Sequence, residues 1–193
     1  MKKINLLAVM ALSAFGLSAN AQIQEGNIMV GGNLANINLG LNDPAIFSAD
    51  ISPKVAWFIQ DNMAVGGYVN FGIETAEHSS TTTNYGVGAL GRYYLGKAVE
   101  VLKHGRFFGE ATVGLGGVNV SGADNTNGLN LSVGPGFAYF ITPNIGLELL
   151  LKYNGLVGLG SEPYQNNLNL SYGFQIYLPG KKTKDKVESD VKM

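Results

Sequence analysis

The residues from 168 to 178 alternate between two kinds of side chain. Every second position is large and apolar: Leu168, Leu170, Tyr172, Phe174, Ile176 and Leu178. The positions between them are small or polar, with Tyr177 as the one exception. Because a β-strand points successive side chains to opposite faces, this period of two predicts a strand with one apolar face and one polar face.

Similar alternating runs recur along the chain, separated by residues that favour turns. They predict strands at residues 28–39, 46–59, 63–75, 85–95, 106–120, 129–141, 145–157 and 168–178. The connections 60–62 and 142–144 are short, whereas 77–83, 121–127 and 158–167 are longer and polar. Short turns on one side and longer loops on the other are typical of barrels in outer membranes, whose strands need about 9–11 residues to cross. The pattern predicts an all-β fold: an eight-stranded antiparallel transmembrane β-barrel with lipid outside and polar groups inside.

Two segments of the chain echo each other. Residues 53–62 and 135–144 carry Pro, Ala, Phe, Ile and Asn at matched places, with Trp57 aligned to Tyr139. Each copy ends in an aromatic cluster followed by a turn, as expected where strands meet the membrane interface. Duplication and convergence both explain the echo, and both predict hairpins.

Composition narrows the class of protein. Glycine supplies 27 of 193 residues and charged residues only 14%, against about 25% in ordinary soluble domains. The absence of cysteine excludes disulfides, a thiol nucleophile and thiolate metal sites. The formal charge is −1, and removing Lys2 and Lys3 would give −1 − 2 = −3. This charge offers no basic surface for nucleic acid, and we expect none as a partner.

The first residues have the pattern of a cleavable secretory signal. Lys2 and Lys3 precede an apolar run, and the small residues Ala19 and Ala21 end it. This order predicts a signal peptide at residues 1–21, cut before Gln22. We expect the barrel domain at residues 22–179. Residues 180–193 are rich in charge and lack an apolar period, which predicts a disordered periplasmic tail.

Alternation also predicts which charged side chains enter the lumen. The inward set contains three carboxylates and three cations: Glu74, Arg92, Arg106, Glu110, Glu148 and Lys152. Unpaired buried charge is costly, so we expect these residues to pair. Leu90, Phe108, Phe140 and Leu150 should also point inward. Since side chains fill an eight-stranded barrel, a structural plug is favoured over a gated pore.

The signal peptide, the eight strands and the chain length resemble the small outer-membrane β-barrel family that includes the OmpA transmembrane domain and OmpX. The last strand is also similar to the insertion signals of such barrels, with Ser171, Gly173, Ile176 and Leu178 at the matching places. The resemblance implies a monomer in the outer membrane of a Gram-negative-type bacterium, in contact with lipid and lipopolysaccharide. It implies delivery by periplasmic chaperones and the outer-membrane insertion machinery. We expect no cofactor.

Three functions are compatible with this pattern. A non-enzymatic structural or surface-interaction role is favoured, and a narrow porin-like passage for ions or small solutes is the alternative. A lipid A-modifying enzyme is third, because His78 and Ser80 have a spacing that resembles lipid A deacylases. A polar loop supplies neither an orienting carboxylate nor an oxyanion hole, so we expect no catalysis. Residues 124–127 lack the spacing of a calcium loop, so we expect no metal site.

Overall fold

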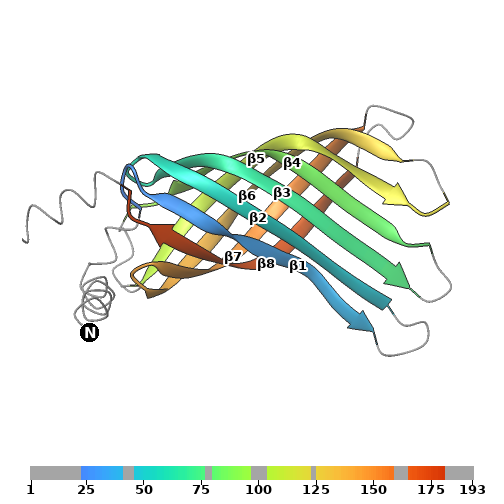
Figure 1. Cartoon of the computed structure of the whole chain (residues 1–193), viewed down its shortest axis with the longest axis horizontal. Coiled ribbons are helices and arrows are strands. Elements are labelled where there is room, and N and C mark those ends of the chain that lie inside the picture. Colours follow the sequence, from blue (N-terminus) through green and yellow to red (C-terminus); the bar gives the residue numbers. More distant parts are fainter. Residues whose placement is uncertain are drawn as a thin grey trace, which may run out of the picture.

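The computed structural model describes residues 23–40, 46–76, 80–96, 104–122, 125–158 and 165–180. These residues form eight strands: β1 (Ile28–Gly40), β2 (Ile46–Gln60), β3 (Met63–Ala76), β4 (Thr82–Tyr94), β5 (Gly105–Val120), β6 (Thr126–Thr142), β7 (Ile145–Gly158) and β8 (Gln165–Leu178). Each strand is antiparallel to the next, and β1 pairs with β8 to close the barrel (Figure 1). The prediction of an eight-stranded antiparallel barrel is confirmed.

Three strands, β4, β6 and β8, begin clearly earlier than the sequence predicts. Each of these starts three residues earlier than the apolar alternation indicates, at Thr82, Thr126 and Gln165. The added residues still pair with their neighbours, as Thr82 does with Glu74 and Val120. Backbone pairing therefore continues beyond the part of each strand whose outer face must be apolar to contact lipid.

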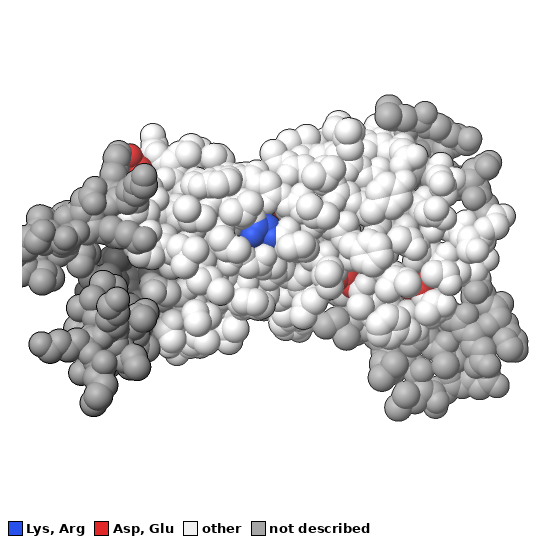
Figure 2. Space-filling model, in the orientation of Figure 1, with Lys and Arg blue, Asp and Glu red and all other residues white. Residues whose placement is uncertain are grey.

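The outer surface of the barrel is apolar. On β8, the alternating set from Leu168 to Leu178 is exposed, whereas Ser171, Gln175 and Tyr177 are buried. Figure 2 shows one face that is mostly uncharged, with a small basic patch near its middle and small acidic patches toward the two ends. Such a surface is suited to lipid. Within the described residues, no helix has the length and apolarity needed to cross a membrane.

Two tight turns mark one end of the barrel, here called the turn end. They join Gln60 to Met63 and Thr142 to Ile145, as the sequence predicts. Asn62 adopts a positive φ of 66°, a conformation that asparagine tolerates better than most residues. The register shifts between Phe58 and Gln60, and again at the equivalent step in the second turn. The sequence echo therefore corresponds to two hairpins with the same irregularity.

Aromatic side chains fill the lumen at the turn end. The aromatic plug consists of Phe58, Tyr94, Phe108, Phe140 and Tyr177, all buried. Their ring centroids lie 5.2 to 6.2 Å apart in successive pairs. Such tilted contacts are favourable for aromatic rings.

The residues just before β1 cover the aromatic plug at the turn end of the barrel. The amide of Gly26 donates to the carbonyl of Phe58 at 2.8 Å, and the amide of Asn62 donates to that of Ile23 at 2.8 Å. The amide of Gly180 donates to Asn27 Oδ1 at 3.1 Å, which ties the exit of β8 to the same segment. Both ends of the described chain thus contribute to closing the turn end.

Several predictions fall outside the described residues. The signal peptide at 1–21 and all of the tail at 180–193 except Gly180 are among them. So are His78 and Asp124. The domain boundaries therefore stay predictions.

Candidate functional site in the barrel lumen

Arg92 lies at the centre of the lumen and joins two carboxylates. It stands on β4 directly opposite Glu110 of β5, with Nη2 to Oε2 at 2.6 Å and Nε to Oε2 at 3.0 Å. Its Nη1 reaches across the lumen to Glu148 Oε1 of β7 at 2.6 Å. All three side chains are at most 1% exposed. One guanidinium therefore satisfies two buried carboxylates, which is the geometry that arginine's fork of donors permits.

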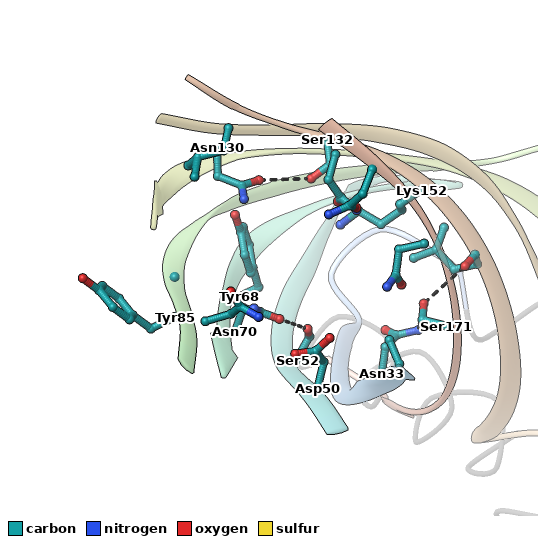
Figure 3. A pocket seen from close by; sticks show the side chains of 18 of the residues that line it. Asn33, Asp50, Ser52, Tyr68, Asn70, Tyr85, Asn130, Ser132, Lys152 and Ser171 are labelled. Carbon is teal, nitrogen blue, oxygen red and sulfur yellow. Dashed lines mark hydrogen bonds between the residues drawn. The ribbon is translucent and has the colours of Figure 1, made fainter. Parts of the chain in front are cut away.

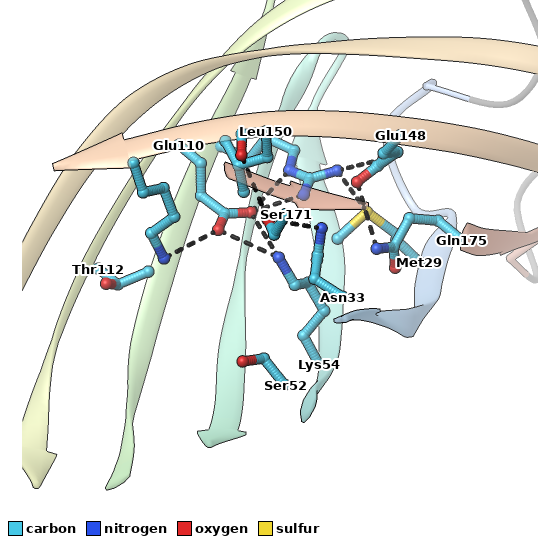
Figure 4. Close-up of polar contacts among 12 residues, drawn as sticks. Met29, Asn33, Ser52, Lys54, Glu110, Thr112, Glu148, Leu150, Ser171 and Gln175 are labelled. Atoms are coloured by element: carbon cyan, nitrogen blue, oxygen red, sulfur yellow. Dashed lines mark hydrogen bonds and ion pairs between the residues drawn. The ribbon is translucent and has the colours of Figure 1, made fainter. Parts of the chain in front are cut away.

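Two lysines complete the group around Glu110. Lys54 of β2 donates from Nζ to both carboxylate oxygens, at 3.1 and 3.0 Å. Lys152 of β7 donates to Oε1 at a longer 3.4 Å. We call Lys54, Arg92, Glu110, Glu148 and Lys152 the charge cluster; Figure 4 shows its contacts. Four strands are joined through it, and every charge in it has a partner, as burial demands.

The charge cluster is continuous with the aromatic plug below it. Arg92 packs its guanidinium over the ring of Phe108, 4.0 Å from the centroid. Glu148 accepts hydrogen bonds from Gln175 Nε2 and Tyr177 Oη, each at 3.2 Å. Tyr177 is the exception in the alternation of β8, and its contacts explain its inward position. Its ring packs in the aromatic plug, and its hydroxyl donates one of the hydrogen bonds that Glu148 accepts.

The structure brings together four of the six charged residues expected in the lumen: Arg92, Glu110, Glu148 and Lys152. Glu74 and Arg106 are not part of the charge cluster. Glu74 is exposed near the far end of β3, opposite Ser48 and Thr82. Arg106 is half-buried at the start of β5 and donates to the carbonyl of Gly105 at 3.1 Å. Alternation assigns a face to a residue but not a height along the barrel axis, so it could not exclude these two.

Lys54 is the cluster residue that the sequence prediction missed. It occupies the same face of β2 as Ser52, Ala56 and Phe58, so the alternation that identified the others applies to it as well. Asp50 lies earlier on the same face of β2 and lines the polar cavity of the lumen. With these two residues in place of Arg106 and Glu74, the inner charges again number three of each sign.

The residues of the predicted insertion signal have structural contacts of their own. Ser171 is buried and donates to the carbonyl of Leu150 at 3.3 Å. Gly173 faces β1 so closely that a Cβ there would lie 2.6 Å from the carbonyl oxygen of Gly32. Ile176 and Leu178 are exposed on the outer face. Recognition of these residues by the insertion machinery stays a prediction.

Above the charge cluster, the lumen opens into a polar cavity of about 240 Å³. Its lining includes Lys54, Glu110 and Lys152 at the floor, and seven asparagines. Figure 3 shows Tyr68, Asn70, Ser52 and Asn130 arranged around it. The walls are held by short contacts such as Ser52 Oγ to Asn70 Oδ1 at 2.6 Å. The cavity opens at the end of the barrel opposite the tight turns, here called the loop end.

Glycines make room for the ring of Tyr68 in the cavity wall. A Cβ at Gly88 or Gly114 would come within 2.8 Å of the Tyr68 ring or its hydroxyl. The ring therefore lies across β4 and β5. Lys152 Nζ stands 5.8 Å from its centroid, within range of a cation–π contact. Tyr68 and Lys152 together form the boundary between cavity and charge cluster.

The described residues hold no group of three or more His, Cys, Asp or Glu side chains that could bind a metal. His104 is exposed at the turn end, where its ring meets Tyr139 edge-on at 6.3 Å.

The sequence matches no known family model and no curated protein. The fold matches solved structures. Neisserial surface protein A superposes with a TM-score of 0.56 at 19% identity, over 78% of this chain and 95% of that one. The attachment invasion locus protein Ail of Yersinia pestis superposes with a TM-score of 0.50 at 15% identity, over 80% of this chain and 100% of that one. The chain therefore has the fold of the small eight-stranded outer-membrane β-barrels.

Proposed function

We propose that this protein is an outer-membrane β-barrel with a closed lumen and a structural or surface-interaction role. Its exposed apolar wall supports a location in a membrane, and the fold supports the outer membrane of a Gram-negative-type bacterium. We also propose a monomer that reaches the membrane through periplasmic chaperones and the insertion machinery.

The observation that carries the proposal is the continuity of charge cluster and aromatic plug. Arg92 spans the lumen between Glu110 and Glu148. Directly below, Phe108 and Tyr177 contact the same groups, and the segment before β1 covers the end. Opening a path would separate buried ion pairs, which costs several kcal/mol for each partner removed. The closed form is therefore the resting state.

The surface-interaction role is supported by the cavity at the loop end and by the polar sequence of the longer connections 77–83, 121–127 and 158–167. Two proteins of the same fold are named as a neisserial surface protein and as an attachment invasion locus protein. We propose the same broad class of role for this chain, without catalysis.

Solute efflux from proteoliposomes tests the closed state. Vesicles that contain the wild-type protein should retain a small uncharged solute almost as well as empty vesicles. Vesicles with Arg92→Ala should leak faster, because a large buried side chain is lost from the centre of the lumen. Rapid efflux through the wild type, equal to that through Arg92→Ala, would contradict a closed barrel.

A narrow passage for ions or small solutes is the second candidate. It is favoured by the polar cavity, which reaches from the loop end down to Lys152, the most exposed member of the charge cluster at 18%. If Lys152 moved away from Glu110, Arg92 would still block the path. The efflux experiment separates the two functions directly.

A further inference from the structure

We infer that the polar cavity at the loop end is a binding site for an uncharged sugar ring. The inference goes beyond the closed-barrel function and uses it only for the floor of the site. It follows from the lining of the cavity, its charge balance, its size and one unsatisfied buried atom.

The lining requires a ligand that both donates and accepts hydrogen bonds. Seven asparagines face the cavity together with Ser52, Ser132 and Ser171. Each asparagine amide offers two donors and one acceptor, and each serine hydroxyl offers both functions. A ring that carries several hydroxyl groups has the same dual character. Some of these groups bond to one another, as Ser52 does with Asn70 and Asn154 with Asn167, and an apolar ligand could not pair with the donors and acceptors that these contacts leave over.

The charges of the lining cancel. Asp50 and Glu110 stand against Lys54 and Lys152, and both lysines are bonded to Glu110. An anionic ligand would have to displace Glu110 from two cations, and a cationic ligand would have to compete with them. An uncharged ligand avoids both costs.

One buried acceptor points to a missing donor. Asn33 is only 6% exposed and lines the cavity. Its Nδ2 donates to Ser171 Oγ at 3.4 Å, but its Oδ1 has no hydrogen-bond partner within the described part of the chain. A buried polar atom without a partner is costly, and a small turn of the Asn33 amide toward the cavity that it lines would let a ligand hydroxyl satisfy it.

The dimensions limit the ligand to a single ring. The cavity of about 240 Å³ is smaller than the roughly 300–1,000 Å³ of pockets for drug-sized molecules. Tyr68 supplies an aromatic face at its lower wall, and the nearby Lys152 ammonium has donors left beyond its one bond to Glu110. A longer glycan could place only its terminal ring here.

Titration of the protein in lipid nanodiscs tests the inference, with asparagine side-chain amides observed by NMR. The probes are methyl β-D-glucopyranoside, its anionic glucuronide counterpart and cationic glucosamine, and no sugar-based detergent is present. The uncharged probe should shift the cavity amides saturably, and the charged probes should bind about tenfold or more weakly. The indole of Trp57, exposed on the outer face, should not move. A parallel titration with maltotriose distinguishes the end of a glycan chain from a free monosaccharide.

Asn33→Leu is the decisive variant, because it removes the unsatisfied acceptor at nearly constant volume. It should weaken binding about tenfold, as expected for one lost hydrogen bond, while the barrel stays folded. Asn166→Leu is the matched control, since Asn166 is exposed and lies outside the cavity lining. Asn130→Leu in the wall from β6 provides a second test that does not depend on Asn33.

Three results would overturn the inference: unsaturable shifts, equal shifts with all three probes, or unchanged binding by both cavity variants. Each would show that the lumen holds water and has no sugar site. Efflux is measured separately, so a leaky barrel that binds sugar and a closed barrel that does not are distinguishable.

Discussion

At the scale of single residues, the lumen depends on matching each buried charge with a partner. The Arg92 side chain has no exposed surface and contacts Glu110 and Glu148 at 2.6 Å. The sequence could indicate that these residues face inward, because alternation along a strand fixes the face. It could not indicate that Glu74 and Arg106 stand at other heights, because height depends on the register between strands. Lys54 follows the same alternation, although the sequence prediction does not include it.

Replacing Arg92 by alanine should destabilise the barrel strongly. The substitution leaves Glu148 without the cation that pairs with it in the described part of the chain, and leaves Glu110 with two lysines. Breaking a buried pair in this way typically costs about 3–5 kcal/mol. The free energy of unfolding, measured by urea titration in lipid vesicles, reports the loss. Arg106→Ala is the matched control and should change it much less; equal effects of the two variants would refute a special role for the cluster.

At the scale of elements, the seam between β1 and β8 needs close backbone approach. Gly173 of β8 faces Gly32 and Asn33 of β1, and a Cβ there would meet the carbonyl oxygen of Gly32 at 2.6 Å. The alternation predicted β8 well because lipid outside enforces it. It did not predict the segment before β1, which covers the turn end through backbone hydrogen bonds to Phe58 and Asn62 that carry no side-chain pattern.

Gly173→Ala should therefore weaken the closure of the barrel. The backbone of β1 must shift to accept the methyl group, so we expect a lower unfolding midpoint and slower folding. Gly91→Ala is the control, since a Cβ at Gly91 meets nothing within 4 Å. That change should be neutral or slightly stabilising, because alanine reduces the freedom of the unfolded chain. If both variants unfold at the same midpoint, the close approach at the seam has no energetic importance.

The C-terminal end of β8 gives a second prediction at this scale. The double substitution Ile176→Asp, Leu178→Asp places charge on the lipid-facing wall, where an arginine or lysine costs about 2–4 kcal/mol at the midplane, an aspartate costs less, and either costs less again near the interface. It also removes the apolar end of the predicted insertion signal. We expect periplasmic accumulation and proteolysis, visible in fractionated cells. Normal yield in the outer membrane would show that these positions serve neither purpose.

At the scale of the whole molecule, the barrel divides into a plugged end and an open polar end. The fold could be predicted because lipid, backbone pairing and strand length act on every strand alike. The division could not, because it arises from which inward side chains share a height: the aromatic residues gather at the turn end, and the asparagines near the loop end. Outer-membrane barrels have short periplasmic turns and longer outside loops, so we predict that the turn end lies in the periplasm.

Cysteine labelling tests this orientation. The chain contains no cysteine, so single cysteines can be introduced at Thr82, near the loop end, and at Asn62, in a tight turn. An impermeant reagent applied to intact cells should label the first and not the second, and permeabilised cells should show both. Labelling only of the cysteine at Asn62 would reverse the topology.

The central claim is that the charge cluster and the aromatic plug hold the lumen closed, and single-channel conductance in planar bilayers tests it most directly. Wild type and Arg106→Ala should pass little steady current, whereas Arg92→Ala and Glu148→Ala should pass clearly more, because each opens the cluster at its centre. A large, stable wild-type conductance that neither Arg92→Ala nor Glu148→Ala changes would contradict the account and establish the barrel as a pore.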